Sequence, residues 1–139
     1  MSKKVDELRN SLQDQLNAAE ARLNNVKASL DKASSETEAA ITAKLDEAKN
    51  KFEWSKREAE SAKAKVTAYF DEKKTETKAE IAEWKRERHQ KKLDSRADKA
   101  EDYAVSAITM AVMTIDEAEY ATLEAIASRI DAEVTRSEN

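Results

Sequence analysis

Apolar residues recur every seven positions through the first third of the chain, in two rows that lie three or four residues apart. Rows spaced in this way are typical of helices that pack side by side as a coiled coil. The pattern therefore predicts a long amphipathic helix that begins near residue 3. The first row contains Val5, Leu12, Ala19, Val26, Ala33 and Ala40, and the second contains Leu16, Leu23, Leu30 and Thr37.

The heptad register shifts by one residue after this segment. Either a stutter in one continuous helix or a true break produces such a shift. Ser35 followed by Glu38 matches the capping box that begins a helix, so the sequence predicts a boundary near 33–36. In the new register the apolar positions are Ile41, Leu45, Ala48, Phe52, Ala59, Ala62, Val66 and Tyr69, which extends the heptad-seam helices over about 3–72.

A second boundary is predicted at the charged segment 71–77. No large apolar side chain occurs from Asp71 to Lys78, and Thr77 with Glu80 forms another capping-box pattern. We expect the chain to reverse here and a C-terminal helix to cover 77–136. A further boundary signal lies at Asp94–Ser95, although an exposed stretch of one continuous helix has the same pattern.

The longest uncharged run in the chain has thirteen residues, from Tyr103 to Ile115. A helix needs roughly 20 apolar residues to cross a bilayer, so no transmembrane segment is predicted. On a helical wheel, large aliphatic residues of 103–134 share one face, and Glu117, Glu124 and Asp131 share a solvated one. An alanine face lies beside the aliphatic face, which predicts that this apolar core packs against two other helices. The alanine face contains Ala107, Met110, Ala111, Ala118, Ala121, Ala125 and Ala132.

The composition supports an entirely helical fold. The chain has 139 residues with no Gly and no Pro, and its 25 Ala are joined by many Glu and Lys, which are strong helix formers. Leu, Ile, Val and Phe supply only 22 residues, so the core is thin, but a net charge of −4 is too small for the usual disorder signature. We predict an all-α fold: one domain over 1–139, an elongated antiparallel bundle or coiled coil of three or four long helices.

The expected helix lengths do not match. A helix over 77–136 would be roughly 90 Å long and would exceed either N-terminal helix. Two arrangements would cover the excess: residues 3–72 form one long helix with a soft join, or a second chain covers the exposed part.

The charges are distributed unevenly. Residues 51–100 carry 15 basic and 11 acidic groups (+4), whereas 101–139 carry 2 and 9 (−7). The simplest expectation is that the basic middle faces the acidic C-terminal helix within one molecule, and the alternative is an external anionic partner. Segment 84–99 concentrates this signal, because a Trp beside cations suits a lipid headgroup region or a nucleobase. The candidate anion-binding residues are Trp84, Lys85, Arg86, Arg88, Lys91, Lys92, Arg96 and Lys99.

The sequence carries no recognisable catalytic or cofactor pattern. Phosphate-binding loops need glycine, and the single histidine, His89, lies in a strongly basic segment that does not suit a triad base. A di-iron bundle needs Glu-x-x-His motifs, but Arg86 stands three residues before His89. The absence of Cys removes thiolate metal sites and disulfides. A carboxylate-only metal site is the remaining alternative, with Glu101, Glu117 and Glu124 as ligands.

We therefore expect a non-catalytic structural or interaction protein that acts through amphipathic helix surfaces, with a protein partner or self-association and no cofactor. The alternatives are binding to an anionic membrane or polymer through 84–99 and a carboxylate metal bundle; a pI near 5.3 disfavours nucleic acid. MSKKVDELRN lacks an apolar signal region, which favours the cytoplasm. The composition resembles that of late-embryogenesis-abundant proteins and exchangeable apolipoproteins, from which the chain departs in its aliphatic segment 103–134.

Overall fold

A computed structural model describes residues 3–138; residues 1, 2 and 139, which the predicted domain includes, lie outside this range. Over the described range the chain is all-α, as predicted, and contains no strand. Helix α1 covers Lys3–Lys32, a 3-10 turn covers Ala33–Ser35, α2 covers Glu38–Lys73, α3 covers Lys78–Arg86 and α4 covers Gln90–Glu138.

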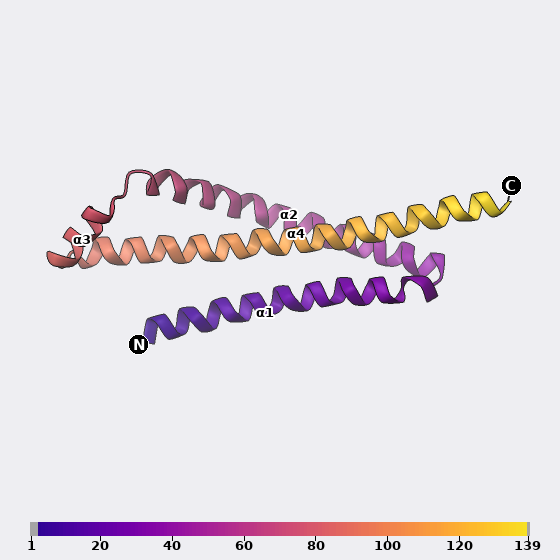
Figure 1. Ribbon diagram of the computed structural model, residues 1–139, viewed down its shortest axis with the longest axis horizontal. Coiled ribbons are helices and arrows are strands. Elements are labelled where there is room, and N and C mark those ends of the chain that lie inside the picture. The colour runs from indigo at the N-terminus through magenta and orange to yellow at the C-terminus, as the bar shows by residue number, and fades with distance from the viewer. Residues whose placement is uncertain (1–2, 139) are drawn as a thin grey trace.

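The three long helices form an elongated up-down-up bundle (Figure 1). Helices α1 and α4 run in the same direction and α2 runs antiparallel to both. The most extensive contact joins α2 to α4, and α1 packs mainly against α4. Helix α4 is therefore the common partner, which confirms the predicted antiparallel bundle. The alternative of one long helix over residues 3–72 is wrong, because the chain reverses between α1 and α2.

Small side chains line the contact between α2 and α4. The heptad row predicted from Ile41 to Tyr69 is buried or half-buried throughout, and its buried members are Ile41, Ala48, Ala59 and Ala62. Small residues allow helix axes to approach closely, so backbone and Cβ atoms supply much of the packing.

Aromatic pairs extend this contact toward both ends of the molecule. Phe52 stacks on Tyr120 with ring centroids 6.0 Å apart, and Tyr69 meets Tyr103 edge-on at 4.4 Å. Each pair joins α2 to α4. The uncharged run from Tyr103 to Ile115 therefore lies in the central helix of the bundle, as expected.

The boundaries predicted at 33–36 and 71–77 coincide with the structural ones, but one cap differs. Helix α2 is capped by Thr37, whose hydroxyl accepts a hydrogen bond from the Ala40 amide at 3.1 Å. Ser35, the predicted cap, instead lies in the 3-10 turn and donates to the Lys32 carbonyl at 3.0 Å. Thr77 caps α3 as predicted, since its hydroxyl accepts from the Glu80 amide at 3.1 Å.

A single C-terminal helix over 77–136 is wrong, because the chain breaks between α3 and α4. Arg88 adopts a left-handed conformation with φ of 56°, and the His89 amide donates to the Trp84 carbonyl at 2.9 Å. With a weaker bond from the Arg88 amide to the Lys85 carbonyl, this geometry is a Schellman motif, which usually contains glycine at the left-handed position. The candidate boundary at Asp94–Ser95 lies inside continuous α4.

The alanine face of α4 is exposed, although the sequence predicted that a helix would cover it. Ala107, Ala111, Ala118 and Ala121 are all exposed, and both α1 and α2 pack on the remaining circumference. The last turns of α4 are exposed as well, from Asp131 to Ser137. At 49 residues α4 is about 73 Å long against about 54 Å for α2, so part of the expected length mismatch remains.

Replacing Arg88 by glycine should strengthen the turn between α3 and α4. For a residue with a Cβ the left-handed conformation is less stable by roughly 1–2 kcal/mol, whereas glycine adopts it without this strain. We expect Arg88→Gly to slow hydrogen exchange of the His89 amide about fivefold, the equivalent of about 1 kcal/mol. Ala82→Gly, within α3, is the control and should speed the same exchange. Faster exchange in Arg88→Gly would contradict this account of the turn.

Candidate functional site

The structure brings the basic segment 84–99 to one end of the molecule, where α3 turns into α4 (Figure 1). Arg96 pairs with Glu76 at 2.6 Å and Lys99 pairs with Glu72 at 3.0 Å. Both carboxylates lie at or just after the C-terminal end of α2. The Lys92 ammonium lies 5.6 Å from the centroid of the Trp84 ring, a cation–π contact that occupies the Trp predicted to stack on a ligand.

The expectation that the basic middle faces the acidic C-terminal helix holds for the part of it in α2. Helix α2 packs along α4, and Lys51 pairs with Glu119 across this contact at 3.3 Å. Residues 90–99 lie on the same helix α4 as the acidic residues beyond 101 and cannot face them. The paired cations of segment 84–99 have their acidic partners at the end of α2 and in the turn after it.

Four of the seven candidate cations keep exposed, unpaired side chains within residues 3–138. We call Lys85, Arg86, Arg88 and Lys91 the basic tip; all four are exposed and none forms an ion pair in that range. His89, beside them, contacts Glu87 at 2.7 Å and is exposed.

An open hollow of about 470 Å³ lies next to the tip, between the end of α2, α3 and the start of α4. Three carboxylates, Glu72, Glu76 and Glu80, line it together with four cations and Trp84. An anion that entered the hollow would meet carboxylates as well as cations. The tip is therefore the more favourable surface for an anionic partner.

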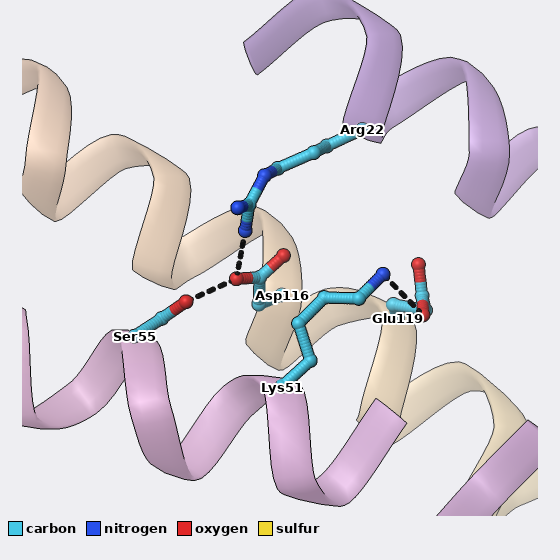
Figure 2. Close-up of polar contacts among 5 residues, drawn as sticks. All are labelled: Arg22, Lys51, Ser55, Asp116 and Glu119. Carbon is cyan, nitrogen blue, oxygen red and sulfur yellow. Dashed lines mark hydrogen bonds and ion pairs between the residues drawn. The ribbon is translucent and has the colours of Figure 1, made fainter. Parts of the chain in front are cut away.

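A buried polar cluster joins all three long helices (Figure 2). Asp116 on α4 is 1% exposed, and its Oδ2 accepts from the Arg22 guanidinium of α1 at 2.5 Å and from the Ser55 hydroxyl of α2. Its Oδ1 has no hydrogen-bond partner among residues 3–138. Beside it Lys51 of α2 donates to Glu119 of α4 at 3.3 Å. Breaking a buried ion pair from one side is costly, because the remaining charge is left without compensation.

Sequence reasoning missed this cluster, although a signal was present. Ser55 continues the α2 row by falling between Phe52 and Ala59, and Asp116 continues the spacing of three and four from Met113 to Tyr120. Asp116 also directly follows the uncharged run from Tyr103 to Ile115, a position that fits the charged end of that run equally well. When a polar residue occupies a heptad core position, that position is the stronger signal. It predicts a buried polar contact even where the neighbouring residues are charged.

Helix α1 buries only one of its two apolar rows. In the first row Ala19 and Val26 are buried, whereas Leu16, Leu23 and Leu30 of the second row are 54%, 41% and 46% exposed. We call these three leucines the leucine row. Since they recur every seven residues, they form a stripe along the helix that the bundle leaves half uncovered.

The metal hypothesis gains no support from the geometry. Among residues 3–138 no three His, Asp or Glu side chains lie close enough together to hold a metal ion, and Glu117 and Glu124 are exposed. In the same part of the chain no helix is long and apolar enough to cross a membrane.

Comparisons with protein families, with curated proteins and with solved structures found no match to this chain.

Removing Arg22 should destabilise the fold more than removing Lys51, because the carboxylate of Asp116 is 1% exposed whereas that of Glu119 is 12% exposed. We expect Arg22→Met to lower the free energy of unfolding by about 3 kcal/mol, because the Asp116 carboxylate stays buried with only Ser55 as a donor. Adding Asp116→Leu should recover most of that loss. Urea unfolding followed by circular dichroism measures both effects.

The matched control for this experiment is Lys51→Met, which removes the partner of the less deeply buried Glu119 and should cost no more than about 1 kcal/mol. Equal losses for Arg22→Met and Lys51→Met would contradict the role given to the buried cluster.

Proposed function

We propose that this protein is a non-catalytic interaction protein that acts through amphipathic helix surfaces, chiefly the leucine row of α1. The observation that carries the proposal is the half-covered coiled-coil seam: α1 has two apolar heptad rows, and α4 covers one of them. A seam of this type is stable when both rows are buried, so the uncovered leucines favour a further helix.

The size of the apolar effect supports the same proposal. Full burial of a leucine contributes about 1.5–3 kcal/mol, so each half-exposed leucine offers a partner about 1 kcal/mol. Single exposed leucines are ordinary on protein surfaces, but three in one stripe form a contiguous apolar patch.

The polar groups of the chain support a non-catalytic role. Ser55 is buried and its hydroxyl is bonded to Asp116, so it is not available as a nucleophile. Among residues 3–138 the one polar contact of the His89 ring is with the Glu87 carboxylate, at an exposed turn, and a nucleophile would need a hydroxyl or thiol in that place. These arrangements use polar groups to hold helices and turns.

A photo-crosslinking amino acid at position 23 tests the proposal in cells that express the protein. We expect adducts from position 23 and none above background from position 14, because Asp14 lies on the exposed side of α1 away from the leucine row. Equal labelling from the two positions, or no adduct from position 23, would overturn the proposal.

A second function is favoured by the basic tip: binding to an anionic membrane or polymer surface. Each Lys or Arg near an anionic surface contributes about 1 kcal/mol, and the four tip residues are exposed and unpaired within residues 3–138. Arg96 and Lys99, which sequence analysis grouped with them, are neutralised by α2 and would contribute less.

Vesicle co-sedimentation distinguishes the contribution of the basic tip from that of the paired Arg96 and Lys99. We expect binding to vesicles rich in phosphatidylserine to weaken with added salt. Changing Lys85, Arg86, Arg88 and Lys91 to Gln should weaken it by more than about a hundredfold. Arg96→Gln with Lys99→Gln, the control, should have a small effect. Binding that ignores salt and the tip substitutions would reject this function.

A further inference from the structure

The residues beside the leucine row carry opposite charges on the two sides of its centre. Glu20 and Lys27 belong to one row of α1 that flanks the leucines at heptad spacing, and Leu23 lies between them. Both side chains are exposed, and within residues 3–138 neither forms an ion pair. They are seven residues apart, about 10 Å along the helix, so they do not pair with each other.

We propose that the leucine row is a self-association surface, on which α1 pairs with α1 of a second copy of this chain in an antiparallel, two-fold symmetric contact. This inference rests on the function proposed above and names its partner. With the symmetry axis at Leu23, Leu16 lies opposite Leu30 of the partner subunit. Glu20 then lies near the partner's Lys27, and the same pair occurs again on the other side of the axis.

The charges select the antiparallel orientation. In a parallel pair the two-fold axis runs along the helices, so the flank that carries Glu20 and Lys27 would face the opposite flank of the second α1, and these charges would not meet. In the antiparallel pair both contacts attract. Leucine burial supplies the affinity in either case, whereas the flanking charges decide the direction.

The opposite flank of the leucine row is the first apolar row, with the buried Ala19 and Val26, and it carries no charge that opposes this pairing. Beyond Glu20 and Lys27 the next row of α1 contains the exposed Asn10, Asn17 and Asn24, with Lys3 and Asp31 at its two ends. A lipid surface fits less well. Membrane-bound amphipathic helices carry polar faces rich in Lys and Arg, whereas α1 mixes six basic with five acidic residues.

Sedimentation equilibrium of the full chain tests the proposal. We expect reversible dimers over the micromolar-to-millimolar range, roughly three decades of concentration, because the apolar contact is small. Glu20→Lys and Lys27→Glu should each weaken the dimer about tenfold, since each variant converts two attractive contacts into two repulsive ones. The double variant Glu20→Lys/Lys27→Glu should restore the original affinity to within about twofold.

Two further variants test whether the dimer contact lies at the leucine row. Leu23→Asn should weaken the dimer with helix content unchanged by circular dichroism, because Leu23 is half exposed in the monomer. Asp14→Lys makes the same change in charge as Glu20→Lys on another side of α1 and should leave the affinity unchanged.

A chain that stays monomeric over the whole range overturns this inference, as does a dimer that the double variant fails to restore. The crosslinking experiment distinguishes that failure from failure of the proposed function. Position 23 adducts to a different protein, with a monomeric purified chain, would overturn self-association alone; no adduct at all would overturn both. Vesicle binding lost in Leu23→Asn, with no dimer, would assign the row to lipid and would also overturn the inference.

Discussion

The close antiparallel contact between α2 and α4 holds the molecule together, and small side chains make it possible. Ala48, Ser55, Ala59 and Ala62 are buried along α2, where a typical coiled coil has leucine and isoleucine. Close approach of the two helices replaces side-chain volume with contacts between backbones. The chain therefore builds its main interface with few large apolar residues. The leucines it does have are concentrated on α1, the helix that packs less extensively.

The small side chains in the middle of the α2 seam specify the alignment of the helices less sharply than large interlocking ones would. Asp116 makes the alignment more specific. Its carboxylate meets Arg22 and Ser55 at once, from two different helices, and any shift by a heptad would leave a buried charge unpaired. The polar cluster fixes the alignment of the helices, and the alanines allow the close packing that holds them together. It also ties α1 to a pair of helices that contact each other far more extensively.

The helical class and both boundaries before α3 follow from the sequence, because heptad rows and the Thr77 cap act locally. The break at Arg88 does not, since the usual signal for a left-handed turn is glycine and the chain has none. The basic segment was recognised from its composition, but which of its cations remain unpaired depends on where α2 ends. Only the folded chain brings Glu72 and Glu76 to Lys99 and Arg96. Burial of Asp116 likewise depends on Ser55 and Arg22, which lie 61 and 94 residues earlier in the sequence.

The direction of α4 has an electrical consequence for the whole rod. Helix α4 begins among lysines and arginines and ends among glutamates and aspartates, so its side-chain charge has the same polarity as its peptide dipoles. Most helices place charges that oppose the peptide dipole; here the two fields add along the longest axis of the molecule (Figure 1). A molecule polarised in this way turns in an external field before it makes contact. A charged partner at a distance would therefore meet a chosen end of the rod, not a random side.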